Sequence, residues 1–278
     1  MHYYGGTLNY YLPIVMSKFF NIPILIHSHN SQANNPKLRN LHVLIRFVHN
    51  LFFNSFNIAC SKEAGAWMFG SKNNFKLIIN GIETEKYKKA YHIGQKKKKS
   101  YFPEDAVVIG NIGRFNRQKN HEFLLYFLSY LHKSGESKYH LLLVGEGELE
   151  KNIVEKAKEL EIDNFIRILS FQQNIEEYYG LIDIFMMPSL FEGLPLVLIE
   201  AQAAGIPILV SDKVDSQIKV NDNLSFLNLN DSLEEIEKNF TTVLYKGHQE
   251  SSLVQTDFEL EVMSKKILKI YKTLSIEK

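Results

Sequence analysis

Two glutamates eight residues apart, Glu192 and Glu200, lie in the segment whose residue types best suit a ligand site. The segment, PSLFEGLPLVLIEA, follows an apolar run, and we expect a helix to begin at or just after Pro195, because proline sacrifices no hydrogen bond in a first helical turn. Such a helix start presents free N–H groups and a positive dipole end to an anion such as a diphosphate. These N–H groups belong to Gly193, Leu194 and Leu196. The alternative is an ordinary strand–loop–helix crossover.

The same two carboxylates do not suit the hydrolysis of a glycoside. A retaining glycosidase holds its two carboxyl groups about 5 Å apart, whereas eight helical residues span about 12 Å. We therefore expect Glu192 and Glu200 to hold different hydroxyls of one long ligand. Taken alone, Glu200 is also explained as an acid in the first turns of a helix, where the dipole favours it.

A second segment, GNIGRFNRQKN, follows the first predicted strand of the second half of the chain. Gly113 lets a ligand approach the backbone closely. Arg114 offers a fork of donors to phosphate oxygens, and Lys119 offers a point charge. Two cations beside a helix start would stabilise a departing diphosphate. Taken alone, the segment is also explained as a solvated loop with ordinary basic residues.

A third candidate, the pair His27 and His29, ends an apolar run. We expect the two rings to project from opposite faces of the strand, which makes shared metal binding unfavourable. One histidine would then line a cleft or serve the structure. The sequence holds no Asp-x-Asp motif and no cluster of Cys and His, so it requires no metal. Gly145-Glu146-Gly147 lacks the third glycine of a dinucleotide-binding loop and predicts a strand-to-helix turn.

The composition indicates a globular protein of one large or two ordinary domains. Hydrophobic residues make up 45% and charged residues 23% of the 278 residues. The net charge of +1 gives no reason to expect nucleic acid as a partner. One cysteine, Cys60, excludes an internal disulfide framework. Because no run resembles a signal peptide or a membrane span, we expect a cytoplasmic protein, with peripheral contact at the inner membrane face left open.

Short apolar runs alternate with amphipathic ones along the whole chain, which predicts α/β domains with parallel sheets. In the first half we expect strands at 22–27, 56–60 and 76–79 and helices at 37–53 and 63–69. The lysine-rich stretch 85–102 is predicted to be a linker, with its run 96–99 either solvated or a patch for anionic lipid. The second half predicts strands at 107–112, 140–144, 165–169, 184–187 and 208–210, with helices at 120–132, 150–160, 175–181, 196–204, 233–245 and 258–274.

The predicted helix at 37–53 carries one apolar stripe, which consists of Leu38, Leu41, Ile45, Val48 and Phe52. We expect this stripe to face the core. Docking of the helix on a membrane, with Arg39 and Arg46 at its flank, is the alternative.

Together these segments closely resemble family 4 retaining glycosyltransferases of the GT-B fold, especially bacterial exopolysaccharide and capsule enzymes. The matching stretches follow the family's order over most of the chain: IPILIHSHNS, ACSKEAGAWMFG, IINGIETEKY, IGNIGRFNRQKN, LLLVGEGELE and IDIFMMPSLFEGLPLVLIEAQAAGIPILVSD. The pairing of a Glu-x7-Glu motif with a Gly-Arg…Lys loop ahead of it is the specific part of the resemblance.

The resemblance implies a role for each matching position. Glu192 would hold hydroxyls of the donor sugar, and Glu200 would accept hydrogen bonds from the ribose. Arg114 and Lys119 would grip the diphosphate, and His29 would reach the transferred sugar from the first domain. Backbone groups would complete the donor site: Gly193, Leu194, Pro195 and Leu196 at the sugar and phosphate, and Ser170, Phe171 and Gln172 near the base.

Two departures from the family pattern concern Ser170, which stands where glycine is usual, and the start of the chain. Family members have a further strand, a glycine-rich loop and more βα units before the segment that opens here at His2. The resemblance therefore implies a GT-B protein with an incomplete N-terminal, acceptor-side domain at 1–90. A nucleotide-sugar domain would follow at 91–257, and a last helix at 258–278 would pack back on the first domain.

The function that we predict is transfer of a sugar, with retention and without metal, from a nucleotide sugar (UDP as the nucleotide) to a glycan or polyprenyl-linked acceptor in surface polysaccharide synthesis. The residues leave open whether retention involves attack from the leaving-group face or a covalent intermediate. One alternative is a truncated, non-catalytic remnant that binds nucleotide, or a subunit that a partner completes. Another is a different GT-B enzyme, such as an epimerase or a phosphorylase.

Overall fold

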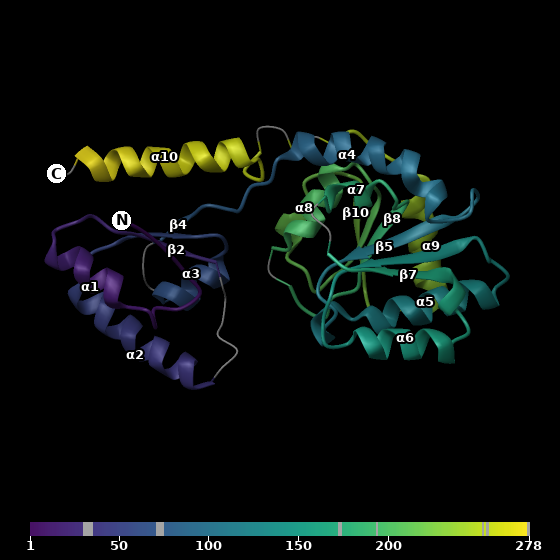
Figure 1. Cartoon of the computed structure of the whole chain (residues 1–278), viewed down its shortest axis with the longest axis horizontal. Coiled ribbons are helices and arrows are strands. Elements are labelled where there is room, and N and C mark those ends of the chain that lie inside the picture. The colour runs from purple at the N-terminus through teal and green to yellow at the C-terminus, as the bar shows by residue number, and fades with distance from the viewer. Residues whose placement is uncertain are drawn as a thin grey trace. The chain divides into compact units, whose positions relative to one another are not determined.

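The computed structural model of the chain describes residues 1–29, 36–70, 75–171, 174–192, 194–251, 253 and 256–276, and only the backbone at 36, 38 and 276. The chain folds into two compact units (Figure 1). Unit 1 combines Met1–Gly81 with Gln255–Lys278, and unit 2 is Ile82–Val254.

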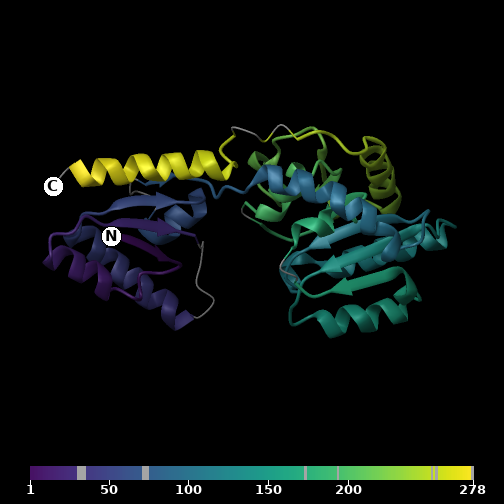
Figure 2. The ribbon, with the colours of Figure 1, turned by 45° about the horizontal axis from the view of Figure 1, so that its top comes forward.

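Unit 1 is built on a parallel sheet in which the strands follow chain order. These strands are β1 (His2–Gly5), β2 (Leu25–Ser28), β3 (Phe56–Ala59) and β4 (Lys76–Leu77). One face of the sheet is covered by α1 (Leu12–Phe19), α2 (Pro36–Phe52) and α3 (Lys62–Phe69), and the other by α10 (Leu260–Ile276), as Figures 1 and 2 show. Because neighbouring side chains of a strand point to opposite faces, Ile26 packs under the helices and Leu25 packs under α10.

Unit 2 is built on a larger parallel sheet with the strand order β10-β9-β8-β5-β6-β7. Its strands are β5 (Val107–Ile112), β6 (Tyr139–Val144), β7 (Ile166–Leu169), β8 (Ile184–Met187), β9 (Ile208–Ser211) and β10 (Leu224–Leu227). Its helices are α4 (Thr84–Lys97), α5 (His121–Lys133), α6 (Glu150–Glu159), α7 (Glu176–Tyr179), α8 (Leu196–Ala203) and α9 (Leu233–Tyr245). From β5 the chain adds β6 and β7 on one side of the sheet, and it then adds β8, β9 and β10 on the other side. The strand order therefore switches beside β5, the place where such sheets bind ligands.

The main core of unit 2 lies between one face of this sheet and the helices α5, α6 and α9. Leu128 of α5 and Phe240 of α9 are fully buried there beside Leu141 and Leu143 of β6. Burial of a side chain of this size stabilises the fold by about 1.5 to 3 kcal/mol. Figure 1 shows α4, α7 and α8 on the opposite face of the sheet.

The predicted α/β class with parallel sheets is confirmed, and the predicted strands and helices lie where the structure has them, apart from a few residues at their ends. The sequence did not predict β1, α1 or β10.

The prediction of a linker at 85–102 is wrong, because most of this stretch forms helix α4 of unit 2. The helix packs against α7 with almost no space between the two backbones. A Cβ atom added to Gly94 would lie 2.1 Å from the carbonyl oxygen of Glu177, and one added to Gly180 would lie 2.2 Å from that of Tyr91. At this contact the two glycines take the place of the apolar stripe that usually marks a helix in a sequence.

The prediction that the stripe Leu41, Ile45, Val48 and Phe52 faces the core is also wrong. Ile45 is half-buried, but Leu41, Val48 and Phe52 are exposed, and the side chain of Leu38 lies outside the described residues. The inner side of α2 instead carries His42, Arg46 and His49, which bond Trp67 of α3 and Tyr11.

Candidate functional site

The candidate residues of unit 2 follow strands that end at the same edge of its sheet. Since all the strands are parallel, the loops after β5, β6, β7 and β8 lie at this carboxyl edge. These loops are 113–120, 145–149, 170–175 and 188–195, of which 172, 173 and 193 lie outside the described residues.

The loop after β5 is held in place by its own backbone and by two asparagines. The side chain of Asn116 accepts a hydrogen bond from the N–H of Lys119 and so caps the short helix η2 (Arg117–Lys119). Asn120, with φ 54°, adopts the left-handed conformation that asparagine tolerates and turns the chain into α5. Lys119 therefore projects from a defined turn.

Three hydrogen bonds tie this loop to the loop after β8. The side chain of Asn120 donates to the carbonyl of Pro188 over 3.1 Å, and the N–H of Leu190 donates to the carbonyl of Gln118 over 2.9 Å. The side chain of Gln118 in turn donates to the carbonyl of Phe191 over 3.0 Å. The two loops are thus fixed relative to each other.

Lys119 and Glu192 meet at the centre of this arrangement. The Lys119 ammonium lies 2.8 Å from Oε1 of Glu192, and the two side chains are only 13% and 10% exposed. The contact is an ion pair by distance but lacks the alignment of a hydrogen bond. A Cβ atom at Gly113 would lie 3.2 Å from Cε of Lys119, so the glycine leaves room for the lysine stem. The structure brings together these three predicted residues.

Arg114 belongs to the same loop but points elsewhere. Its guanidinium lies 3.2 Å from Oε2 of Glu148, and both side chains are largely exposed. An exposed pair of this kind is weak and easily exchanged for another anion. The arginine is therefore beside the site without contributing to its stability.

Glu200, on α8, is held by two tyrosines that the sequence analysis did not single out. The hydroxyl of Tyr179 donates a hydrogen bond to Oε2 of Glu200 over 2.5 Å, and Tyr87 of α4 also bonds this carboxylate. Burial raises the pKa of the Glu200 carboxyl, while the hydrogen bonds from the two tyrosines act in the opposite direction. No spacing rule could link Tyr87 to Glu200, because they are far apart in the chain.

The helix start after Glu192 differs slightly from the prediction. Pro195 is the residue before the first helical one, with φ −73° and ψ 118°, and α8 begins at Leu196. Leu194, Pro195 and Leu196 are half-buried, whereas Gly193 lies outside the described residues.

The predicted base-side loop follows β7. Ser170 and Phe171 are exposed, and Gln172 lies outside the described residues. Phe171 is 51% exposed, so an aromatic ring is available at this edge for stacking.

The predicted turn Gly145-Glu146-Gly147 is confirmed and also supports the loop after β5. A Cβ atom at Gly145 would lie 1.9 Å from the carbonyl oxygen of Gly113, and one at Gly147 would lie 2.3 Å from that of Phe115. Only glycine permits this close approach.

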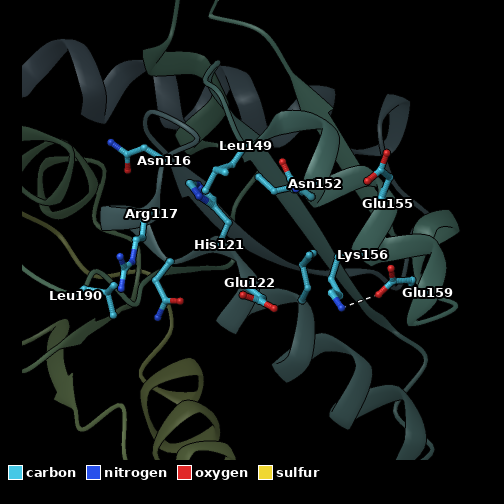
Figure 3. A pocket seen from close by; sticks show the side chains of 13 residues that line it. Asn116, Arg117, His121, Glu122, Leu149, Asn152, Glu155, Lys156, Glu159 and Leu190 are labelled. Atoms are coloured by element: carbon cyan, nitrogen blue, oxygen red, sulfur yellow. Dashed lines mark hydrogen bonds and ion pairs between the residues drawn. The ribbon is translucent and has the colours of Figure 1, made fainter.

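A groove of about 400 Å³ lies between α5 and α6, and residues of the 116–120 loop form part of its lining (Figure 3). Its lining includes Arg117, Glu122 and Asn152. His121 forms part of the wall, but its ring nitrogens are buried and without a partner. Burial, followed by the charge of Lys119, lowers the pKa of His121 to about 4. The imidazole is thus a neutral packing group rather than a side chain offered to the groove.

His29 lies in unit 1, in a group of stacked rings. The prediction that it projects away from His27 is wrong, because residues two apart in a strand share a face. The two imidazole centroids are 4.0 Å apart, and Tyr4 lies 5.6 Å from His29. Burial is the main cause that lowers the pKa of His27, to about 3, and the pKa of His29 is lowered by burial too. Among the described residues, no three His, Cys, Asp or Glu side chains are grouped to hold a metal ion.

A family model and curated relatives match this chain over more than half of its length. The family model described as Glycosyl transferases group 1 matches residues 92–254. EpsF of Bacillus subtilis (strain 168) is 34% identical over 165 residues, which cover 58% of this chain and 43% of EpsF. The UDP-Gal:alpha-D-GlcNAc-diphosphoundecaprenol alpha-1,3-galactosyltransferase of Escherichia coli is 27% identical over 158 residues, covering 55% of this chain and 39% of that protein. The chain therefore spans less than half the length of these curated relatives.

A solved structure matches nearly the whole chain. The crystal structure of Anabaena Alr3699/HepE in complex with UDP has a TM-score of 0.78 at 17% identity, and the match covers 98% of this chain and 78% of that one. A likeness at this identity shows the fold alone. The predicted GT-B fold is confirmed.

Proposed function

Because the chain belongs to the group 1 glycosyl transferases, whose family model matches more than half of it, we propose that it transfers a sugar from UDP to an acceptor hydroxyl with retention of configuration. The observation that carries this proposal is the enclosed pair of Lys119 and Glu192 beside Gly113 at the switch point of a parallel sheet. Ligands of such sheets bind at this edge.

In the proposed reaction, the bond between the anomeric carbon and the diphosphate oxygen breaks, and UDP departs with the electron pair. The acceptor oxygen forms the new bond to that carbon, and its proton passes to the departing diphosphate. Lys119 and Arg114 stabilise the negative charge that develops on the diphosphate, together with the N-terminal N–H groups of α8. The exposed pair of Arg114 with Glu148 opens at little cost, which frees the guanidinium for the diphosphate.

The other predicted residues receive positioning roles in this proposal. Glu192 holds hydroxyls of the donor sugar, and Glu200, which Tyr179 holds in place, accepts a hydrogen bond from the ribose. Ser170, Phe171 and Gln172 lie beside the base, and Gly193 and Leu194 offer backbone to the sugar and phosphate. Unit 1, which carries His29, is the proposed acceptor-side domain, and unit 2 is the proposed nucleotide-sugar domain.

We infer the acceptor class from the E. coli relative, whose name specifies a sugar linked to diphosphoundecaprenol. A lipid-linked glycan used in surface polysaccharide synthesis is the proposed acceptor, and it would be met at the inner membrane face. Within the described chain, no helix is both long and apolar enough to cross a bilayer.

The test is transfer of labelled sugar from a set of UDP-sugars to polyprenyl-diphosphate-linked acceptors. Arg114→Ala should lower the transfer rate by about 10²- to 10³-fold, because it removes one stabilising group from the departing charge. Since Arg114 is exposed, this variant keeps its fold, and Lys151→Ala on the exposed side of α6 serves as the matched control. Equal rates in Arg114→Ala and the parent chain would exclude the proposed role.

A second candidate function is nucleotide binding without turnover, in a subunit that a partner completes. UDP binding by the chain with no transfer to any acceptor would support this candidate, and transfer restored by an added partner chain would establish it.

A further inference from the structure

The outer side of helices α1 and α2 in unit 1 is covered with exposed apolar side chains. More than half of the large hydrophobic side chains that are exposed in the described chain belong to residues 12–52. Phe19 is 79% exposed, and Leu44 and Phe47 are 62% and 63% exposed. We call this surface the α1–α2 apolar face; it consists of Leu12, Val15, Met16, Phe19, Phe20, Ile22, Leu41, Val43, Leu44, Phe47, Val48, Leu51 and Phe52.

The polar residues of α2 fix the direction in which this face points. His42 accepts a hydrogen bond from the N–H of Leu8 over 3.0 Å and bonds the carbonyl of Trp67 over 3.0 Å. Arg46 donates to that same carbonyl over 2.7 Å, and Asn50 donates to Phe69 over 3.1 Å. The polar side chains of α2 therefore find their hydrogen-bond partners within the protein. Rotation of the apolar side inward would break all of these bonds.

The helix α1 lies beside α2, as both ribbon views show (Figures 1 and 2). The hydroxyl of Tyr11 lies 3.0 Å from Nδ1 of His49, and the ammonium of Lys18 donates to the carbonyl of Phe52 over 2.6 Å. On α1 itself only Ile14 and Ser17 are buried. The rest of this short helix faces outward with α2.

The segment that carries the α1–α2 apolar face contains charges of one sign only. Residues 1–62 contain no Asp or Glu, although the whole chain holds 31 of them. The same stretch contains Lys18, Lys37, Arg39, Arg46 and Lys62. The first three are exposed and stand near the ends of the two helices, so cations flank the apolar residues.

An apolar helical face with phenylalanine and leucine at its centre and Lys or Arg at its flanks is the pattern of a helix that lies in a membrane interface. Anionic lipid headgroups attract such cations, whereas an acidic side chain within the patch would be repelled. No described helix is suited to crossing a bilayer, so the apolar residues would insert from one side only. We propose that the α1–α2 apolar face binds the surface of an anionic phospholipid bilayer.

The experiment is flotation of the full chain with vesicles of phosphatidylcholine that contain phosphatidylglycerol, and with vesicles of phosphatidylcholine alone. The parent chain should float with the mixed vesicles and much less with the neutral ones. The double variant Leu44→Glu/Phe47→Glu should bind the mixed vesicles at least tenfold more weakly, because two carboxylates would have to enter the interface. Arg39→Gln should weaken binding to the mixed vesicles about fivefold, the effect of one cation near an anionic surface.

The matched control is Ile93→Glu/Val154→Glu, which places two carboxylates at exposed apolar positions on helices of unit 2. It should float like the parent chain. Trp67, the single tryptophan, checks the fold of the variants, because its indole N–H donates to Gly6 and its ring packs 4.4 Å from His42. Unchanged emission and circular dichroism show that Leu44→Glu/Phe47→Glu remains folded.

Three results would overturn the proposal. The first is equal flotation of Leu44→Glu/Phe47→Glu and the parent chain, and the second is equal binding of the parent to neutral and anionic vesicles. The third is a parent chain that ignores vesicles and forms a dimer in light scattering that the double variant dissociates, which would assign the face to a second copy of the chain. The measurement contains no nucleotide sugar, so its failure is distinguishable from failure of the transfer reaction.

Discussion

Helices α5 and α2 both flank a parallel sheet, but α5 turns mainly apolar side chains inward, whereas α2 turns polar ones inward. On α5, Leu124, Leu128 and Leu131 are buried under the sheet of unit 2, as the hydrophobic period predicts. On α2, His42 and His49 are buried and the leucines and phenylalanines face outward. This difference shows that apolar periodicity predicts where a helix lies. It does not predict which side of the helix faces the core when polar side chains on the other side have buried hydrogen-bond partners.

The largest expected difference between the two helices is in the free energy of unfolding after truncation of a leucine. Leu128→Ala should destabilise the chain by about 2 to 5 kcal/mol, because it leaves a cavity in the core. Leu44→Ala, at a 62% exposed position of α2, should change stability by less than about 0.5 kcal/mol. Urea denaturation of both variants measures the contrast, and equal losses would break the comparison.

A fall in pH should reduce the stability of unit 1 more than that of unit 2. Burial is the main cause that lowers the pKa of His27 to about 3 and of His49 to about 4 in unit 1, and His121 is the corresponding residue in unit 2. Their pKa in the unfolded chain is about 6.5, so between about pH 6.5 and 4 the unfolded state binds protons that the folded state does not. Stability is therefore lost as pH falls through this window, by at most about 1.4 kcal/mol per pH unit for each histidine.

Emission from Trp67 reports unit 1, and circular dichroism reports the whole chain. Urea denaturation at pH 7 and pH 5 should show an earlier loss of Trp67 packing at the lower pH. His49→Gln should reduce this pH dependence. A transition in Trp67 emission that is independent of pH would contradict the account of the buried histidines.

The polar residues on the inner side of α2 should contribute more to the free energy of unfolding than residues of an ordinary exposed surface do. His42→Leu keeps the side chain close to its size but leaves the N–H of Leu8 and the carbonyl of Trp67 without this partner. We expect a loss of about 1 to 3 kcal/mol, the cost of leaving a buried polar group unsatisfied. Chemical denaturation measures it, and a stabilised variant would show that α2 is free to turn its apolar side inward.

The smallest expected effect on stability belongs to a residue with a proposed functional role. Arg114→Ala should leave the denaturation midpoint unchanged, because Arg114 and its partner Glu148 are both exposed. The same variant should transfer sugar far more slowly than the parent chain. A clear shift of the midpoint would mean that the loop after β5 depends on this contact for its fold.

The sequence predicted the sheets, most of the helices and the site loops, because strand–helix alternation and turn residues are local signals. It also predicted the loops that bring Lys119 and Glu192 together, since loops after parallel strands meet at one edge. It did not predict Tyr87 or Tyr179 as partners of Glu200, because these contacts depend on how α4 and α7 pack. Helix α4 itself was missed because Gly94 and Gly180 replace an apolar stripe at its contact.

The proposal that unit 2 holds a nucleotide sugar at this edge is tested most directly by calorimetric titration of the chain with UDP, with Glu200→Ala measured beside it. The account predicts that the parent chain binds UDP and that the variant binds clearly more weakly, because the proposed role of Glu200 is to accept a hydrogen bond from the ribose. Unchanged affinity in Glu200→Ala, or no binding by the folded parent chain, would contradict it.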